Sequence, residues 1–304
     1  MQSKKFILGG GMAGLISAYI NKDYNIISEQ VGGQFASLLP LGPRFVKKTV
    51  HTEWLLKQLG FISKTKNVKV GYYDQGEVKN ECSVEERRIY YFKTRGLKDV
   101  PVSAMSDGER QFKVFKISHR ELLEKLKIEV SDRITIGRVI RIDGAASTLT
   151  VAIGPESKTF EYERIISTIP YPIFMEIAKN IQSKWFSAKY YPTYFAYCLC
   201  ESDELAKKLK TGYDYVYIVS NDLPFHRVSP YQSGFLTESR FYKIPKGWKV
   251  LQREKMEIGQ ICGRIGWERF EWANIDFIGR YAQWAHDIRI SQVVERARGI
   301  SSGK

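Results

Sequence analysis

The sequence contains few of the residues that build covalent or metal-bound frameworks. It has four cysteines and four histidines in 304 residues. Four cysteines do not form a disulfide framework in a chain of this length. Cys198 and Cys200 lie on an apolar run with no histidine nearby. We therefore expect free thiols, no metal site and a reducing, cytoplasmic environment.

Long hydrophobic runs are also missing. No stretch of 18 or more apolar residues occurs, so the sequence predicts no membrane-spanning helix. Lys4 and Lys5 precede a short apolar run, but three glycines interrupt it and no clear cleavage site follows. A signal peptide is therefore not expected. The hydrophobic content of 43% is typical of a globular chain.

Acidic residues are too few to balance the basic ones. The chain has 47 Lys and Arg against 33 Asp and Glu, a formal net charge of +14. Such an excess favours a polyanionic partner, for example a nucleic acid, a nucleotide-linked molecule or an acidic membrane surface. A solvated basic surface explains the charge equally well.

The strongest pattern in the sequence lies in its first 35 residues. Phe6 to Leu8 is apolar, the glycine-rich stretch Gly9 to Gly14 follows, and residues 15–20 then have helical spacing. A second apolar run ends at Glu29. This order of strand, glycine turn, helix, strand and acid fits the dinucleotide-binding pattern G-x-G-x-x-G.

Each residue type in this pattern has a physical role. Gly9 allows a sharp turn, Gly11 allows a pyrophosphate to approach the backbone, and Gly14 allows the helix to pack closely on the sheet. The free N–H groups of the helix attract the phosphates. Glu29 accepts hydrogen bonds from a ribose and would repel a 2′-phosphate, which disfavours NADP. The alternative is a glycine-rich turn in an ordinary α/β protein.

This pattern, the Gly-Gly pair that ends it and two later stretches resemble the superfamily of FAD-dependent amine oxidases and UDP-galactopyranose mutases. A Gly-Gly pair lies in Gln30 to Gln34, directly after the ribose acid. A strand near Val139 precedes a small meander and a strand that ends in Ser167 to Pro170. Near the end of the chain, a turn containing Gly279 and Arg280 precedes a helix expected over 288–298.

This resemblance implies an α/β fold class, with a Rossmann-like FAD-binding domain of the GR2 type and an inserted mixed-sheet substrate domain. The FAD-binding domain would comprise 1–60, 115–170 and 264–304, and the substrate-binding region 61–114 and 171–263. The cofactor-binding residues would be Gly9, Gly11, Met12, Ala13, Gly14, Glu29, Gln30, Gly33, Gln34, Val139, Thr168, Gly279, Arg280, Asp287 and Ile288.

The resemblance also suggests where the chemistry takes place. The expected catalytic residues are His51, Arg227 and Trp284, and the expected substrate-binding residues are Arg44, Lys48 and His226. Two alternatives stay open. His51 could be a histidine at a helix start, with Thr52 as the N-cap and no chemistry, and the pair of His226 and Arg227 could lie on the surface of a hairpin.

The favoured function is FAD-dependent oxidation of a C–N bond in an amine. The stretch Arg87 to Arg95 places aromatic residues among cations, which suits base stacking with phosphate contacts or an edge strand. Together with the charge, it suggests an amine carried on DNA. The chain resembles phage FAD enzymes of thymidine hypermodification, which act on amino-acid-modified thymidine bases in the host cytoplasm. The alternatives are a flavin-dependent sugar isomerase similar to the mutase and a non-catalytic flavin-binding protein.

Hydrophobic periodicity predicts the remaining elements. A capping box at Ser118 to Glu121 predicts a helix start. The expected strands span 68–73, 134–143, 149–153, 159–162, 213–219 and 274–278, and a further helix spans 53–59.

Overall fold

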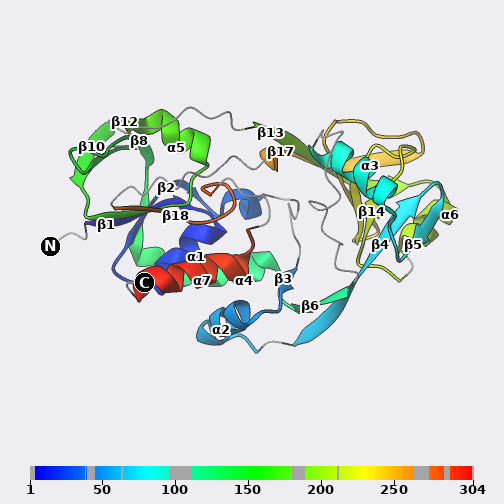
Figure 1. The fold of residues 1–304 in the computed structure, drawn as a ribbon, viewed down its shortest axis with the longest axis horizontal. Helices are drawn as coiled ribbons and strands as arrows, with labels where there is room; N and C mark the ends of the chain where they lie inside the picture. Colours follow the sequence, from blue (N-terminus) through cyan, green and yellow to red (C-terminus); the bar gives the residue numbers. More distant parts are fainter. Residues whose placement is uncertain are drawn as a thin grey trace. The chain divides into compact units, whose positions relative to one another are not determined.

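The computed structural model describes residues 4–37, 39, 45–62, 64–95, 111–179, 189–210, 212–262, 274–283 and 288–302. The chain divides into two compact units (Figure 1). The first comprises Met1–Lys64, Phe115–Ala188 and Gly263–Lys304, and the second comprises Thr65–Val114 and Lys189–Cys262. Residues 171–188, which we grouped with the substrate-binding region by sequence, fall in the first unit.

The first unit is built on a five-stranded parallel sheet with the strand order β18-β11-β1-β2-β7. Its strands are β1 (Lys5–Gly10), β2 (Asn25–Val31), β7 (Ile134–Ile136), β11 (Arg164–Ser167) and β18 (Ile275–Phe277). Ile7 of β1 is in register with Ile26 on one side and Ile166 on the other. This arrangement confirms the α/β class.

Four helices of the first unit share one hydrophobic core with the parallel sheet. They are α1 (Met12–Ile20), α2 (Val50–Gln58), α4 (His119–Glu129) and α7 (Ile290–Ser301). Leu15 of α1, Leu123 of α4 and Val294 of α7 are buried in the core that contains Ile7 and Ile26. Figure 1 shows α1, α4 and α7 side by side below the sheet.

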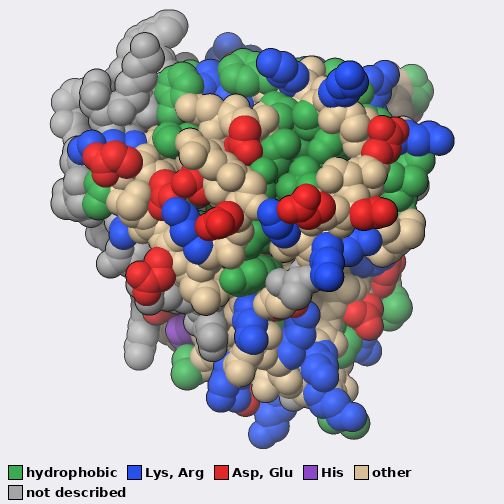
Figure 2. Space-filling model, turned by 90° about the vertical axis from the view of Figure 1, so that its right-hand side faces the viewer, with side chains coloured by type: hydrophobic (Ala, Val, Ile, Leu, Met, Phe, Trp, Pro, Cys, Tyr) green, Lys and Arg blue, Asp and Glu red, His purple; other side chains and the backbone are tan. Residues whose placement is uncertain are grey.

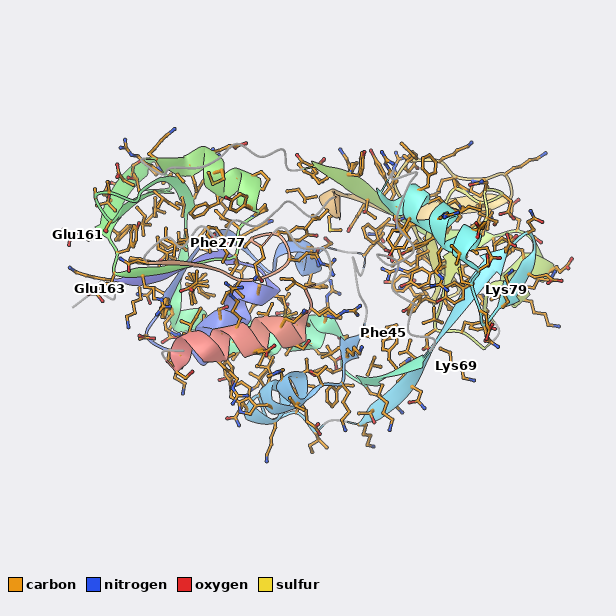
Figure 3. The ribbon with its side chains drawn as sticks, in the orientation of Figure 1. Phe45, Lys69, Lys79, Glu161, Glu163 and Phe277 are labelled. Atoms are coloured by element: carbon orange, nitrogen blue, oxygen red, sulfur yellow. The ribbon has the colours of Figure 1, made fainter. Side chains whose placement is uncertain are left out.

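The first unit also contains a four-stranded sheet with the order β10-β9-β8-β12. Its elements are β8 (Arg138–Asp143), β9 (Thr148–Ile153), β10 (Glu156–Glu161) and β12 (Ala178–Lys179), and helix α5 (Tyr171–Ile177) precedes β12. The ring of Phe277 in β18 lies 4.8 Å from that of Phe174 in α5 (Figure 3). The short elements of this unit are β3 (Val46–Lys47) and two 3-10 helices (Gly33–Ala36 and Ser131–Arg133).

The single strand predicted over 134–143 is wrong, because the chain changes sheets at Gly137. β7 belongs to the parallel sheet and β8 to the four-stranded sheet. A Cβ on Gly137 would lie 2.8 Å from Val151 Cγ1 and 2.9 Å from the Ala152 carbonyl oxygen. Only glycine permits this close passage, so the break has a local cause.

The capping box predicted at Ser118 is confirmed. The Ser118 hydroxyl accepts from the Glu121 N–H at 3.1 Å, and the Glu121 carboxylate accepts from the Ser118 N–H at 2.7 Å. Thr52 is not the N-cap of α2, because the helix begins at Val50 with Thr49 as its cap. The buried Thr52 hydroxyl donates instead to the Lys47 carbonyl oxygen at 2.7 Å.

The second unit contains a mixed sheet with the order β17-β13-β16-β15-β14-β4-β6, and β5 pairs with β4. β14 is parallel to β4, whereas β13, β15, β16 and β17 run antiparallel to their neighbours. The strands are β4 (Thr65–Asp74), β5 (Glu77–Lys79), β6 (Gln111–Phe115), β13 (Lys189–Cys200), β14 (Tyr215–Ile218), β15 (Arg227–Tyr231), β16 (Gly234–Ser239) and β17 (Trp248–Cys262).

Two helices pack on this sheet. α6 (Asp203–Lys210) contributes Leu209 to a core with Val216 and Phe235. α3 (Val84–Arg95) places Tyr90 4.7 Å from the ring of Tyr217. Since Val216 and Tyr217 are successive residues of one strand, the two helices lie on opposite faces of the sheet. Lys79 of β5 forms an ion pair with Glu86 of α3 (Figure 3).

The alternative of an edge strand over 87–95 is therefore wrong, because this stretch is the body of α3. Ser83 and Glu86 form a reciprocal cap, in which the Glu86 carboxylate accepts from the Ser83 N–H at 2.6 Å and the Ser83 hydroxyl accepts from the Glu86 N–H at 3.2 Å. Arg88 pairs with Glu85 one turn earlier at 2.9 Å. The helix turns Tyr90 toward Tyr217 and leaves Phe92 exposed, so the aromatic residues do not form one platform.

The basic excess is visible on the surface. Lys and Arg side chains are spread over the face shown in Figure 2, around an area of hydrophobic side chains. No helix among the described residues combines the length and the apolar character required to cross a bilayer.

Candidate functional site

The turn between β1 and α1 depends on two glycines that cannot carry a side chain. Gly9 has a φ of +101°, and a Cβ there would lie 2.7 Å from Thr168 Oγ1. A Cβ on Gly14 would lie 1.9 Å from the Gly9 carbonyl oxygen. Gly9 thus makes the turn and Gly14 brings α1 against the end of β1, as the sequence predicts.

Gly11 is a glycine of a different kind, because the space above it is open. It is the N-cap of α1, with φ −75° and ψ −178°, which any residue can adopt. The nearest atom to a Cβ there would be Gly33 Cα, at 3.9 Å. The first N–H groups of the helix, including those of Met12 and Ala13, have no acceptor within the helix. Open space over helix N–H groups is what an anionic group requires.

The end of β2 is tied to the same turn by a serine that the sequence pattern did not identify. The Gly10 N–H donates to Ser28 Oγ at 2.8 Å, and the Ser28 hydroxyl donates to the Gln30 carbonyl oxygen at 2.6 Å. The Gly32 N–H donates to the Gly10 carbonyl oxygen at 2.8 Å. A Cβ on Gly10 would lie 2.9 Å from Ser28 Oγ. The sequence did offer a signal for this contact, because Gly10 lies within three consecutive glycines and Ser28 is a small polar residue near the end of the next strand.

The Gly-Gly segment after β2 returns to this turn. Gly33 has a φ of +54°, and a Cβ there would lie 3.2 Å from Gly11 Cα. Gln34 Oε1 accepts a hydrogen bond of 3.0 Å from the Tyr281 hydroxyl. Burial raises the pKa of Tyr281, so its hydroxyl remains a donor at neutral pH. The segment therefore connects the N-terminal turn with the C-terminal turn.

The C-terminal turn packs directly against the beginning of α1. Gly279 has a φ of +97°, and a Cβ there would lie 2.9 Å from Ala13 Cβ. Thr168 lies beside Gly9, and its hydroxyl lies 2.9 Å from the Leu8 carbonyl oxygen. The structure thus brings together Gly9, Ala13, Thr168 and Gly279 from three distant parts of the sequence.

Glu29 and Val139 lie where β2 and β8 approach each other. The Glu29 side chain is 64% exposed, and its carboxylate lies 3.7 Å from Arg138 Nε. The Gly137 N–H donates to the Ser28 carbonyl oxygen at 2.9 Å, which holds β8 next to the end of β2. In open parallel sheets, ligands bind outside the carboxyl ends of the strands, and Glu29 lies at such an end.

The other predicted cofactor residues have varied positions. Met12 is buried in the core, so only its backbone can face a ligand. Gln30 is exposed, Arg280 is half-buried, and Ile288 packs against the core of the first unit. Asp287, together with the predicted Trp284 and Arg44, lies outside the described residues.

His51 and Lys48 are occupied by contacts around α2. His51 Nε2 lies 3.8 Å from the Glu295 carboxylate of α7, and Lys48 Nζ lies 3.6 Å from Glu53. His51 Nδ1 is buried and has no hydrogen-bond partner among the described residues. The contact with α7 gives His51 a structural partner, and its catalytic role stays a prediction.

Arg227 and His226 belong to a buried ionic cluster in the second unit. Arg227 Nε and Nη2 lie 2.8 and 2.6 Å from the carboxylate oxygens of Glu238, and Glu238 is almost fully buried. His226 is 2% exposed, and its Nε2 lies 3.9 Å from Glu238. The alternative of a surface pair is therefore wrong.

The charges of this cluster follow from burial and from the carboxylate. Burial alone would lower the pKa of Arg227, but Glu238 and the neighbouring tyrosines raise it above its ordinary value, so the guanidinium stays charged. For His226, burial outweighs the attraction of Glu238 and lowers the pKa to about 4. His226 is thus neutral at physiological pH.

The low pKa of His226 predicts a loss of stability in mild acid. An unfolded histidine takes up a proton near pH 6.5, whereas the folded one resists protonation until about pH 4. Between these values the unfolded chain binds more protons, so stability falls as the pH falls. Moving from pH 7 to pH 5 should cost wild type roughly 1–2 kcal/mol more than His226→Gln. Urea unfolding of both proteins at the two pH values measures the difference, and equal losses would contradict the buried neutral state.

Lys93 of α3 holds the loop before His226. Its ammonium donates to the backbone carbonyl oxygens of Leu223 at 2.6 Å and Phe225 at 3.1 Å, and also to that of Ser220. Burial lowers the pKa of Lys93 to about 8. No sequence pattern identified this residue, because its partners are backbone atoms distant in the chain.

Within the described part of the chain, no group of three or more His, Cys, Asp or Glu side chains is placed to hold a metal ion. Cys82, Cys198 and Cys200 are free thiols. Burial raises the pKa of Cys198 to about 11, so this thiol is neutral at physiological pH.

No protein-family model and no curated protein sequence matches the chain. Solved structures do match it over nearly its whole length. A reduced UDP-galactopyranose mutase has a TM-score of 0.72 at 13% identity, covering 100% of this chain and 95% of that one. A fatty acid isomerase from P. acnes that produces CLA has a TM-score of 0.66 at 11% identity, covering 99% and 98%. Putrescine oxidase bound to putrescine has a TM-score of 0.64 at 12% identity, covering 100% and 99%. The chain therefore has the fold shared by these enzymes, as its resemblance to the mutases and amine oxidases predicts.

Proposed function

We propose that the first unit binds FAD and that the protein is a FAD-dependent oxidoreductase that oxidises a C–N bond of an amine. One observation carries the proposal. A Cβ on Gly11 would have room, with Gly33 Cα at 3.9 Å as its nearest neighbour, whereas a Cβ on Gly9, Gly14 or Gly279 would collide with neighbouring atoms. Glycines that serve only a turn would not leave this space open at the start of a helix.

The residues present fit a dinucleotide. The N–H groups of Met12 and Ala13 are available to a pyrophosphate beside Gly11, and the exposed Glu29 carboxylate is available to a ribose. Gly33 and Gln34 continue along the same side as Gly11. Gly279 and Arg280 of the C-terminal turn, Val139 and Thr168, and Asp287 and Ile288 before α7 complete the proposed set.

Bound FAD supplies the two-electron oxidation, and the protein must orient the amine and exclude water. Trp284, Arg44, Lys48 and His51 stay our candidates for contact with the substrate. We assign Arg227 and His226 a positioning role in the second unit, because Arg227 is engaged with Glu238 and His226 is buried and neutral. The reaction therefore does not depend on a charged imidazole at position 226.

Gly11→Ala tests the binding site. The backbone at Gly11 suits alanine and no atom lies within 3.9 Å of the new Cβ, so the protein should fold normally. The methyl group would occupy the space assigned to the pyrophosphate. We expect the Kd for FAD to rise at least about tenfold, which is ~1.4 kcal/mol. Fluorescence titration with FAD and the unfolding curve of the FAD-free protein measure the two effects separately.

The wild-type protein provides the baseline for this test. It should be yellow as purified and should release FAD on denaturation, identified by mass. Unchanged FAD affinity in Gly11→Ala would place the dinucleotide elsewhere. Wild-type protein that is colourless and takes up no added FAD would contradict the whole proposal.

The whole-chain likeness to UDP-galactopyranose mutase supports a second candidate, a flavin-dependent sugar isomerase. The two functions differ in the redox state that they need. Loss of the oxidised-flavin absorbance when an amine is added without oxygen supports amine oxidation. Activity on a nucleotide-linked sugar only after reduction with dithionite supports the isomerase.

The net charge of +14 leads us to propose a polyanion as carrier of the amine. An amino-acid-modified thymidine base in DNA is such a substrate, and the free thiols suit a cytoplasmic enzyme. Incubation with DNA that carries the modified base, followed by mass analysis of its nucleosides, tests this substrate. An unchanged nucleoside profile would exclude it.

A further inference from the structure

The second unit displays cations stacked on aromatic rings where β16 ends beside the middle of β13 and β17. We name this set the cation–aromatic surface, and it consists of Tyr194, Arg240, Phe241, Tyr242, Arg253 and Lys255. Strand pairing places Tyr194 of β13 opposite Ser239 of β16 and opposite Lys255 of β17. Arg240 to Tyr242 follow β16 directly, so the six residues come from adjacent backbone segments.

The rings and cations contact one another in series. The Arg240 guanidinium lies 3.4 Å from the ring centroid of Tyr191 and 5.0 Å from that of Phe241. The Arg253 guanidinium lies 4.7 Å from the ring of Tyr242, whose centroid is 6.0 Å from that of Tyr194. Lys255 Nζ lies 6.0 Å from the Tyr194 ring. These contacts orient the rings and hold the cations beside them.

Two of these aromatic side chains are unusually exposed. Phe241 is 64% exposed and Tyr242 is 46% exposed, although they are adjacent in the chain. Isolated exposed apolar residues are common, whereas contiguous exposed apolar side chains rimmed by polar residues mark interaction surfaces. Aromatic rings held at a surface are what unpaired bases stack on.

Cations outnumber acids around these rings. The segment Arg240 to Lys246 contains three cations and no acid. On β17, exposure alternates so that Arg253, Lys255 and Glu257 face solvent and Glu254 is half-buried. Lys255 is paired with Glu257 at 2.8 Å, so part of its charge is offset. The remaining excess is complementary to a phosphate backbone.

We propose that the cation–aromatic surface binds single-stranded nucleic acid, with bases stacked on Phe241 and Tyr242 and phosphates beside Arg240, Arg253 and Lys255. A duplex keeps its bases stacked on each other, so it can use only the cations. The combination sought by sequence in 87–95 thus occurs instead where β16 leads into β17. The inference rests on the proposed function only for its polyanionic substrate, and it requires neither bound FAD nor turnover.

Titration of a fluorescent oligothymidylate at several salt concentrations tests the proposal. Phe241→Ala/Tyr242→Ala should weaken binding about tenfold or more without changing the salt dependence, because stacking involves no ion release. Arg253→Gln/Lys255→Gln should lower the slope of log K against log salt by about 1.4, since each phosphate contact on a single strand contributes roughly 0.7. Phe241→Leu/Tyr242→Leu should bind as weakly as the double alanine variant, and it keeps apolar bulk should the alanines unfold the loop.

Matched controls come from the same unit. Phe92→Ala removes an exposed ring from α3, and Lys207→Gln/Lys208→Gln removes two charges from α6, and both should bind like wild type. Three results would each overturn the proposal. The controls could lose as much affinity as the surface variants, the surface variants could bind like wild type, or a duplex could bind as tightly as a single strand. Binding to anionic vesicles that depends on Phe241 and Tyr242, while oligonucleotide binding does not, would overturn it as well. If the wild-type protein binds the oligonucleotide as proposed but oxidises no amine, only the proposed function is contradicted.

Discussion

Glu238→Ala should lower the free energy of unfolding by about 3–5 kcal/mol, the usual cost of breaking a buried ion pair. Glu238 is 3% exposed and engages the Arg227 guanidinium at 2.8 and 2.6 Å. Removing the carboxylate leaves a guanidinium that cannot release its proton inside the second unit. Urea unfolding at pH 7 measures the loss.

Two further variants separate this effect from the loss of a charge in general. Glu204→Ala breaks a surface pair with Lys208, in which Glu204 is 81% exposed, and should leave the free energy of unfolding almost unchanged. Arg227→Met/Glu238→Leu replaces both partners by apolar groups and should recover most of the loss. If the double variant is as unstable as Glu238→Ala, the loss does not come from an unpaired buried charge, and the ion pair itself stabilises the fold.

Gly14→Ala should destabilise the first unit by about 2–3 kcal/mol, although alanine normally favours a helix over glycine by about 1 kcal/mol. The new Cβ would lie 1.9 Å from the Gly9 carbonyl oxygen. That oxygen is main chain, so either α1 or the end of β1 must shift. The sign of the change therefore distinguishes crowding from helix propensity.

Gly11→Ala is the matched comparison, because both substitutions add one methyl group to the same turn. The structure predicts that Gly14→Ala loses stability, whereas Gly11→Ala loses FAD affinity and keeps its stability. Chemical unfolding of the two FAD-free variants side by side provides the measurement. Equal stability of Gly14→Ala and wild type would mean that α1 does not contact β1 as closely as described here.

Local sequence patterns predicted the elements that are determined by contacts between residues close in the sequence. The β1–α1–β2 unit was predictable because glycine spacing and apolar runs act within 30 residues. The capping box at Ser118 was predictable because both partners lie in one turn. The same signal at Ser83 and Glu86 would have revealed α3, but the aromatics and cations in 87–95 suggested base stacking or an edge strand instead.

Contacts between distant segments could not be predicted in this way. The split at Gly137 depends on Val151 and Ala152 of a neighbouring strand. The hydrogen bond from Gly10 to Ser28, and those from Lys93 to the loop before His226, join residues with no shared pattern. The burial of Arg227 depends on Glu238, eleven residues later, on a paired strand.

The site itself was partly predictable for the same reason. The roles of Gly9, Gly11 and Gly14 follow from one motif. The approach of Gly279 to Ala13 depended on recognising a family plan, because no spacing rule connects residues so far apart. The family resemblance suggested that His51 lies near the chemistry. The structure places it against Glu295 of α7, and its catalytic role stays a prediction.

The contact between Gly279 and Ala13 has a consequence for the order of synthesis. The ribosome makes the glycine turn first, yet the residues that cover it emerge only after the whole second unit. Until then α1 lacks α7, whose Ala297 carbonyl oxygen accepts from Asn21 at 3.2 Å. The first unit therefore cannot complete its core until the segment that contains Gly279 and α7 has been translated. Binding of the proposed cofactor is then a late event.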